Sequence, residues 1–421
     1  MLIPSIDLSR GRIVQLEQGE RMRIERKDID VVINRLSLLG PLAVIDIDAA
    51  KEEGDNRELI KTIARANEIR VGGGIRTPEE ARKLLSLGAE KVIIGSALFP
   101  EGTFSPEMLE KFRRAVGRER IIAALDTRDG RIVTKGWRKD TKERPDTRLL
   151  EQLEKGAWGI LATSVEREGM MQGPDIKGIE RLLQKTALPV TAAGGITSVR
   201  DIRTISSMGA HVQVGMALYT GKLPAEEAFT AALTYDEKGL IPVIAENEEG
   251  ETLMMAWAND NALRKSLESG FLTFYSRSRK RLWTKGESSG NTLSLIAFRP
   301  DCDSDTLRVV VRPAGPVCHT GEESCFGSLS FSLEKLYATI EERFKSPSPG
   351  SYTATLTDTL VREKIMEEAG ELVEGTDRDN KVWEAADLLY FVTVLLQKEG
   401  ISFKDVLAEL RRRRWRERCS Q

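Results

Sequence analysis

The first 235 residues repeat themselves, and this repeat restricts the fold more than any other feature of the sequence. IPSIDLSRGRIV at 3–14 matches IAALDTRDGRIV at 122–133 at six of twelve positions, and Asp7 falls on Asp126. Further on, GGIRTPEEARKLLSLGA and GSALF match GGITSVRDIRTISSMGA and GMALY in the second half. A repeat of this length predicts that two similar halves build one fold.

Each half alternates short apolar runs with amphipathic stretches. Runs such as LAVIDI and KVIIGS have the character of buried strands, whereas PEEARKLLSLGA has helical periodicity. Eight such strand–helix units predict a (β/α)8 TIM barrel. A doubly wound open sheet is the alternative, but it would not need two halves that match so closely.

Composition narrows the class of protein. With 40% apolar residues, 30% charged residues and a net charge of −2, the chain is expected to be globular and without nucleic-acid partners. Its length of 421 residues predicts several domains. Asp7 and Arg10 interrupt the apolar amino terminus and no long apolar run follows, so a cytoplasmic location without membrane partners is expected. In a reducing compartment, the three cysteines within 302–325 favour a metal site or a reactive thiol over a disulfide framework.

Asp7 and Asp126 each follow an apolar run, so a barrel would place both at the carboxyl ends of strands, where barrel enzymes hold their active sites. Two carboxylates in one cavity can divide acid and base roles. The alternative is that each only caps a turn.

Glycines recur at strand ends in both halves, where exposed backbone amides can hold phosphate. Gly73, Gly74 and Gly95 in the first half correspond to Gly194, Gly195 and Gly215 in the second. Any one of them alone would be an ordinary tight turn. Two related sets predict a substrate that carries a phosphate at each end.

The motifs IPSIDLSRGRIVQLEQGE, VGGGIR, GSAL, ALDTRDG…GW and GGI…GMAL closely resemble phosphoribosylformimino-5-aminoimidazole carboxamide ribotide isomerase, a histidine-biosynthesis enzyme, over residues 1–235. The resemblance implies an Amadori rearrangement with Asp7 as general base and Asp126 as general acid, and no metal or redox cofactor. The family usually has aspartate where this chain has Ser164 and Glu168. The implied substrate-binding residues are Gly73, Gly74, Arg76, Gly95, Ser96, Thr163, Gly195, Gly215 and Met216.

After residue 238 the pattern changes to a mixed α+β segment. A strand is expected to run into a helix across LMMAWANDNALRKSLESG, followed by a strand and a basic loop in FLTFYSRSRKRLWTKGESSG. The loop residues Arg281, Trp283 and Lys285 suit a phosphate and a stacked base. A solvated hairpin is the alternative.

The stretch DCDSD at 301–305 is expected to be an alternating strand, with the aspartates Asp301, Asp303 and Asp305 on one face and Cys302 on the other. Carboxylates suit magnesium, and three thiolates suit zinc with a position open for water. His319, next to Cys318, is expected to be a ligand or a proton-transfer group.

The motifs RLWTKGESSGN, DCDSD and CHTGEESCFG strongly resemble phosphoribosyl-AMP cyclohydrolase, which predicts a domain at 236–330. This resemblance implies hydrolytic opening of the adenine ring, with His319 as proton shuttle. It assigns zinc to Cys302, Cys318 and Cys325, with Cys302 and the other two supplied by different subunits of a dimer. It assigns magnesium to Asp301, Asp303 and Asp305.

The remaining residues have a helical pattern after the connector FKSPSPGSYT, and carboxylates recur on single helix faces. They resemble phosphoribosyl-ATP pyrophosphohydrolase, which predicts a helical domain at 331–421. The resemblance implies that Lys364 meets phosphate and that magnesium is bound by Glu367, Glu368, Glu371, Glu384 and Asp387. RRRRWRER at 411–418 is interpreted as a basic helix end and Cys419 as an exposed thiol.

Taken together, these resemblances predict a fusion that acts on phosphoribosyl nucleotides in three consecutive steps of histidine biosynthesis. A homodimer through the last two regions is expected. Two alternatives remain open. In one, the barrel is a non-catalytic scaffold or regulatory module, and in the other it also isomerises phosphoribosylanthranilate.

Overall fold

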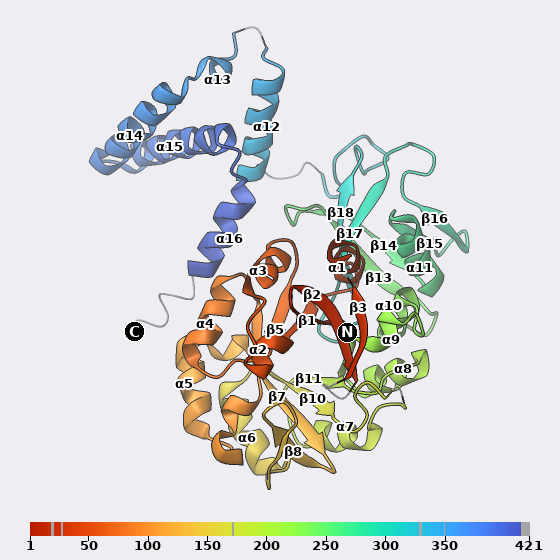
Figure 1. Ribbon diagram of the computed structural model, residues 1–421. Helices are drawn as coiled ribbons and strands as arrows, with labels where there is room; N and C mark the ends of the chain where they lie inside the picture. Colours follow the sequence, from red (N-terminus) through yellow and green to blue (C-terminus); the bar gives the residue numbers. More distant parts are fainter. Residues whose placement is uncertain (18–20, 27, 171, 328–330, 349, 414–421) are drawn as a thin grey trace. The chain divides into compact units, whose positions relative to one another are not determined.

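The structure is a computed structural model that describes residues 1–17, 21–26, 28–170, 172–327, 331–348 and 350–413. The chain forms two compact units, residues 1–327 and residues 328–421 (Figure 1). The barrel and the α+β segment both belong to the first unit. Among the described residues, no helix is long and apolar enough to cross a membrane.

A closed ring of eight parallel strands is formed by the described part of 1–214, and the barrel expected from the repeat is confirmed. Hydrogen-bonded neighbours follow one another in chain order until β12 pairs with β1, which an open sheet would not allow. The strands of the ring are β1 (Leu2–Ser9), β4 (Leu42–Asp46), β5 (Ile69–Gly72), β6 (Lys91–Ile94), β7 (Ile121–Arg128), β10 (Gly159–Ser164), β11 (Val190–Ala193) and β12 (His211–Val214).

Helices surround the ring, so its strands are covered on both faces and consist of nearly continuous apolar runs (Figure 1). The repeat extends to helix capping. Thr77 and Ser198, at corresponding positions, each close a capping box. The helices are α1 (Ile29–Ser37), α2 (Ile47–Lys51), α3 (Arg57–Ala66), α4 (Pro78–Ser86), α5 (Pro106–Val116), α6 (Thr147–Gly156), α7 (Ile176–Leu183), α8 (Val199–Ser207), α9 (Met216–Tyr219) and α10 (Ala225–Ala231), with short 3-10 turns η1 (Ser96–Leu98), η2 (Pro100–Gly102) and η3 (Arg118–Arg120).

Two hairpins extend from the carboxyl ends of equivalent strands. The strand β1 turns back into β2 (Arg12–Glu17), which pairs with β3 (Arg21–Arg26). In the second half, β7 turns back into β8 (Arg131–Thr134), which pairs with β9 (Lys139–Asp140). Each hairpin therefore begins directly after the strand that carries Asp7 or Asp126.

The α+β segment of the first unit contains a four-stranded sheet within its described residues, in the order β14-β13-β18-β17. The expected strand followed by a helix is confirmed, since β14 leads into α11. A separate hairpin pairs β15 with β16. The elements are β13 (Ile241–Glu246), β14 (Thr252–Ala258), α11 (Asp260–Ser269), β15 (Thr273–Ser276), β16 (Arg281–Thr284), β17 (Leu293–Pro300) and β18 (Leu307–Pro313).

The second unit is helical, as its sequence predicts, and packs around a small apolar cluster that includes Ile340, Val361 and Phe391. Several large apolar side chains on its two long helices are exposed, including Met366 (74%), Val373 (82%) and Trp383 (70%). The expected basic helix end lies partly in this unit's last helix, while 414–418 and Cys419 lie outside the described residues. The helices are α12 (Leu333–Lys345), α13 (Tyr352–Thr355), α14 (Asp358–Glu374), α15 (Arg378–Lys398) and α16 (Phe403–Arg413).

Candidate functional site

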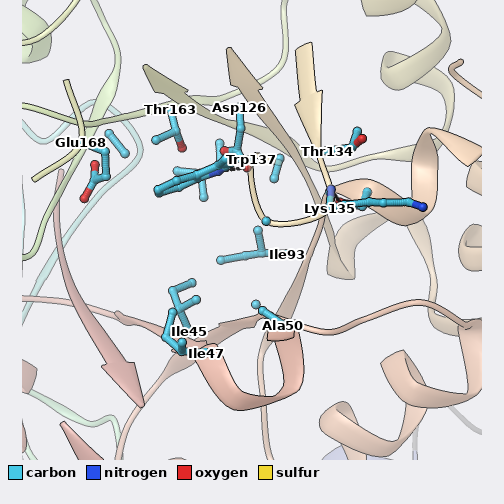
Figure 2. Close-up of a pocket in the computed structure, with 18 of the residues that line it drawn as sticks. Ile45, Ile47, Ala50, Ile93, Asp126, Thr134, Lys135, Trp137, Thr163 and Glu168 are labelled. Atoms are coloured by element: carbon cyan, nitrogen blue, oxygen red, sulfur yellow. Dashed lines mark hydrogen bonds between the residues drawn. The ribbon is translucent and has the colours of Figure 1, made fainter. Parts of the chain in front are cut away.

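A cavity of about 810 Å³ lies at the carboxyl ends of the barrel strands, and both Asp7 and Asp126 line it. They lie on β1 and β7, which hold opposite positions in the ring. Figure 2 shows Asp126 beside Trp137, with the isoleucine side chains of Ile45 and Ile93 across the cavity. Every barrel residue expected to bind substrate also lines it, namely Gly73, Gly74, Arg76, Gly95, Ser96, Thr163, Gly195, Gly215 and Met216.

Three carboxyl groups share this cavity and influence one another. Burial, and after it the charge of Glu168, raise the pKa of Asp7 to about 7. Burial, and after it the charge of Asp126, raise the pKa of Glu168 to about 7. Burial raises the pKa of Asp126 as well, against the opposing effect of hydrogen bonds from Trp137 and Thr163. Carboxyl groups that titrate near neutrality can take up and release protons during a reaction.

Glu168 is therefore part of the barrel site, although its residue type departs from the usual aspartate. Its backbone N–H donates to the Ser164 carbonyl at 3.1 Å, in a turn that directs the side chain into the cavity. The other departure, Ser164, uses its hydroxyl differently, because this hydroxyl donates to the exposed Glu166 at 3.2 Å. Glu168 thus keeps a carboxyl group in the cavity, as an aspartate would, whereas Ser164 has no carboxyl group and does not line the cavity.

Trp137 also lines the cavity, and although it belongs to the ALDTRDG…GW motif, no role was predicted for it. Its indole Nε1 donates to Asp126 Oδ2 at 2.9 Å, from the loop between β8 and β9. Lys135 and Trp137 in this loop have φ of 55° and 68°, which is uncommon for residues other than glycine. The Lys135 N–H donates to Ser96 Oγ at 2.7 Å and ties the loop to the rim. Sequence spacing alone does not predict the contact between Trp137 and Asp126, because it forms only when β8 turns back along β7.

The glycine pairs after β5 and β11 are required by close packing of the backbone. Gly73 and Gly194 both have φ of 96°. A Cβ atom would lie 2.2 Å from the Asp46 carbonyl oxygen at Gly73 and 2.8 Å from the Ser164 carbonyl oxygen at Gly194. Only glycine fits at either place, and the backbone that it allows borders the cavity.

The aspartates after β17 do not lie on a strand, so the expectation of an alternating strand at 301–305 is wrong. This segment is the turn between β17 and β18. Asp301 Oδ1 accepts from the backbone N–H groups of Asp305 and Thr306 at 3.1 and 3.2 Å, and such local bonds favour a turn. The turn nevertheless brings the three carboxylates together, since Asp301, Asp303 and Asp305 each offer an oxygen within 4.8 Å of the others.

Two of the three expected zinc-binding thiols are neighbours. A hydrogen bond joins Cys318 and Cys325, and Thr320 Oγ1 donates to Cys318 Sγ at 3.1 Å, which lowers the pKa of Cys318. His319 Nδ1 lies 3.8 Å from Cys318 Sγ. Within the described residues, Cys302 does not join Cys318 and Cys325 in a group of metal-ligating atoms. One chain therefore does not gather all three thiols.

The basic stretch near 280 forms a hairpin, which was the alternative to the expected loop, so Arg281 and Trp283 lie on the strand β16. Alternating apolar residues allow this pairing, and the Trp283 ring packs against Phe274 with their centroids 5.1 Å apart. Burial, and after it Cys318, raise the pKa of Cys325, and the charge of Lys285, which follows the strand, opposes this rise. The hairpin thus holds a cation near the paired thiols.

In the helical unit, three of the five expected magnesium ligands converge. Glu368 and Glu371 on α14 and Glu384 on α15 each offer an oxygen within 4.8 Å of the others. Asn380 Nδ2 donates to Glu384 Oε1 at 2.9 Å and orients it. Glu367 and Asp387 lie outside this group, and Lys364 Nζ lies 2.8 Å from the Glu367 carboxylate.

Three models of known protein families match consecutive parts of this chain. A family model described as "Histidine biosynthesis protein" matches residues 1–224, which is more than half of the chain. The chain belongs to the histidine biosynthesis protein family. This histidine biosynthesis protein continues with matches to phosphoribosyl-AMP cyclohydrolase over residues 254–327 and phosphoribosyl-ATP pyrophosphohydrolase over residues 333–414. It is thus a fusion of isomerase, cyclohydrolase and pyrophosphohydrolase enzyme domains, as the motifs predict.

Curated relatives of this histidine biosynthesis protein match part of the chain and nearly their own full length. The "Histidine biosynthesis bifunctional protein HisIE" of Escherichia coli K12 is 43% identical over 42% of this chain and 91% of the relative. The protein of the same name from Pyrococcus furiosus is 43% identical over 42% of this chain and 92% of the relative. The protein of the same name from Bacteroides thetaiotaomicron is 40% identical over 43% of this chain and 95% of the relative.

Proposed function

We propose that this chain is a trifunctional enzyme that cleaves phosphoribosyl-ATP to phosphoribosyl-AMP and pyrophosphate, opens the adenine ring, and isomerises the resulting aminoaldose. The observation that carries the isomerase step is the barrel cavity, where three carboxyl groups with raised pKa lie among glycines related by the repeat. The other two steps rest on the matches to the cyclohydrolase and pyrophosphohydrolase families.

For the isomerase step, Asp126 donates a proton to the ribose ring oxygen and Asp7 removes the C2′ proton, so that an Amadori rearrangement proceeds by acid–base catalysis. A pKa of about 7 at Asp7 suits a base that works near neutrality. The raised pKa of Asp126 suits a group that must hold a proton, and Trp137 orients it. The glycine segments at 73–74 and 194–195, together with Gly95 and Gly215, bind the two terminal phosphates.

For ring opening, Cys302, Cys318 and Cys325 hold zinc and the turn aspartates hold magnesium. Thiolate suits zinc and carboxylate oxygen suits magnesium, and the convergence of Asp301, Asp303 and Asp305 fits the latter. When bound, zinc would lower the pKa of a water molecule, so that the water could lose a proton near neutral pH and act as the nucleophile toward the adenine ring. His319 transfers the proton, and Arg281, Trp283 and Lys285 bind the nucleotide.

For pyrophosphate release, Glu368, Glu371 and Glu384 hold magnesium, and Glu367 and Asp387 complete the site once a cation and substrate are bound. Three converging carboxylates repel one another, as the raised pKa of Glu384 reflects after the effect of burial. A divalent cation relieves this repulsion. Lys364 forms an ion pair with Glu367, and it exchanges this partner for a substrate phosphate when the substrate binds.

The assembly that suits this chemistry is a homodimer. Cys302 does not join the other two thiols within the described part of one chain, so a second copy would supply it. The exposed Met366, Val373 and Trp383 give the helical unit an apolar surface for the same partner. Domain boundaries at 235 and 330 and a cytoplasmic location stay predictions.

A coupled assay of the purified full chain tests this function. Phosphoribosyl-ATP is supplied with magnesium and zinc, and each product is identified by mass. Appearance of the aminoketose supports three activities, whereas accumulation of the aminoaldose identifies the barrel as a scaffold. A parallel reaction with phosphoribosylanthranilate tests the wider specificity, for which no feature of the cavity argues.

A further inference from the structure

The turn that carries Cys302 and the three aspartates is bonded to the barrel through its backbone. The Thr234 N–H donates to the Ser304 carbonyl at 2.8 Å, and Thr234 Oγ1 donates to the Asp303 carbonyl at 3.2 Å. The ring of His211, the first residue of β12, lies beside the backbone of Cys302. Two residues from the barrel side of the first unit thus contact three consecutive residues of the turn.

The strand that leads into this turn is also fixed to the barrel. The Phe298 N–H of β17 donates to the Leu38 carbonyl after α1 at 2.8 Å. The Phe298 ring contacts that of Phe229 on α10, with centroids 4.8 Å apart, and both side chains are fully buried. Arg299 Nε lies 3.2 Å from Glu68 Oε1. Buried aromatic contact and a row of polar contacts give this junction a defined geometry.

The turn has a backbone conformation that needs such support. Ser304 has φ of 63°, in the left-handed region, although it is not glycine, and it is 3% exposed. A residue held there persists only when its surroundings determine it. The bonds that Asp301 accepts from Asp305 and Thr306 close the turn internally. The external hydrogen bonds to Asp303 and Ser304 come from Thr234, and the backbone of Cys302 lies beside His211.

We propose that the barrel is a structural part of the cyclohydrolase, in which Thr234 and His211 position the 301–306 turn and so raise its affinity for zinc. These two are positioning residues, since they contact the backbone of the turn and not the thiol or carboxylate groups. The inference rests on the proposed zinc site at Cys302. It gives the barrel a second role that is independent of its own cavity, because neither Thr234 nor His211 lines that cavity.

The test uses the full chain with Thr234→Val, which removes one hydroxyl donor and keeps the size of the side chain. The rate of zinc release to a chelator and the zinc concentration for half-maximal ring opening are measured, with isomerase turnover in the same preparation. Loss of one hydrogen bond to the turn is expected to raise the rate of zinc release about fivefold. The zinc concentration for half-maximal ring opening is expected to rise by about the same factor. Ring-opening kcat at saturating zinc is expected to stay near that of the unmodified chain.

Thr234→Ser, which keeps the hydroxyl, is expected to restore both zinc measurements. The matched control is Thr62→Val on α3, where the hydroxyl donates to the Glu58 carbonyl far from the turn in sequence. His211→Leu is the second variant, and it is expected to speed zinc release in the same direction.

Three results overturn the proposal. Unchanged zinc release in both Thr234→Val and His211→Leu would show that the turn does not depend on the barrel. A parallel fall of isomerase turnover and zinc affinity in both would show that these residues only maintain the fold of the unit. Absence of zinc binding by the unmodified chain would reject the proposed zinc site itself. Measuring zinc binding by the unmodified chain therefore distinguishes a wrong zinc site from a turn that does not depend on the barrel.

Discussion

The barrel and the helical unit each gather three carboxyl groups, but in different surroundings. Asp7, Asp126 and Glu168 are far apart in the sequence and meet only because the ring of strands encloses a cavity. Glu368, Glu371 and Glu384 lie on two consecutive helices, and each offers an oxygen within 4.8 Å of the others. The barrel carboxyl groups, which lie on separate elements around a cavity, suit proton transfer to different atoms of a substrate. The three glutamates of the helical unit, called here the convergent group, suit a shared cation.

This difference shows that residue type alone does not decide the chemistry of a carboxyl group. In the barrel, burial is the largest cause of the raised pKa, and an indole donor fixes the orientation of Asp126. In the helical unit, neighbouring carboxylates add to the effect of burial on Glu384. A third arrangement is that of the thiols, where the described part of one chain holds only Cys318 and Cys325 together.

The comparison is tested most strongly at Asp126. Asp126→Asn is expected to lower isomerase kcat about 1,000-fold, since the amide cannot transfer a proton and general acid–base groups contribute about 100- to 10,000-fold. Pyrophosphate release and ring opening are expected to stay unchanged. Asp129→Asn is the matched control, because Asp129 is exposed and outside the cavity lining. Near-normal isomerase turnover in Asp126→Asn would remove Asp126 from the acid role.

The convergent group is tested by Glu371→Gln combined with Glu384→Gln. Neutral amides bind magnesium poorly, so pyrophosphate release is expected to fall by about 100-fold or more, while supplied phosphoribosyl-AMP is still processed. Glu363→Gln with Glu374→Gln makes the same two changes at exposed positions of α14 outside the group. Pyrophosphate release at the unmodified rate in the first pair would show that the cation is held elsewhere.

The shared zinc site is tested by complementation between two inactive chains. Cys302→Ala and the double variant Cys318→Ala/Cys325→Ala are each expected to lose ring opening. When co-expressed, half of the dimers are mixed and each mixed dimer has one intact site, so about a quarter of the sites are expected to recover. Activity is measured on dimers whose composition is established by mass. Mixed dimers without any activity would show that zinc is bound within one chain.

The smallest effect is expected from Glu168→Gln. If Asp7 is the base, isomerase kcat/KM falls as pH drops through its pKa of about 7, because the protonated carboxyl cannot accept a proton. The charge of Glu168 raises that pKa, so its removal is expected to move the acid limb to lower pH. Glu166→Gln is the control, since Glu166 is exposed and bonds Asp129 and Ser164 instead. An acid limb unmoved in Glu168→Gln would show that the two groups are not coupled.

The repeat made much of the barrel predictable. Because Asp7 matches Asp126 and Gly73 matches Gly194, strand ends and tight turns could be assigned in both halves before any contact was known. These features depend on local rules, namely the apolar pattern of a strand and the backbone freedom of glycine. The cavity then collected all the expected barrel residues, since the carboxyl ends of a closed ring face one another.

The wrong expectations share a cause. An alternating pattern was interpreted as a strand at 301–305, but the carboxylate of Asp301 bonds nearby backbone N–H groups and stabilises a turn. The basic stretch was interpreted as a loop with a hairpin as the alternative, and the hairpin is what forms, since Leu282 and Trp283 pair with Tyr275 and Phe274. The outcome at 301–305 depended on hydrogen bonds of the Asp301 side chain, and the outcome at 281–284 depended on pairing with another strand. The local pattern of residue types reveals neither contact.

The repeat and the apolar periodicity of the sequence predicted the closed barrel, because both are properties of neighbouring residues. The order of the three enzyme regions and the candidate ligands came from the resemblance of the motifs to known families. Only the tertiary structure decided that Trp137 bonds Asp126, that Glu168 raises the pKa of Asp7, and that Thr234 bonds the 301–306 turn. These contacts join separate elements, and their distances follow from how strands, hairpins and helices pack. Packing depends on the shape of the whole unit, which no local pattern specifies.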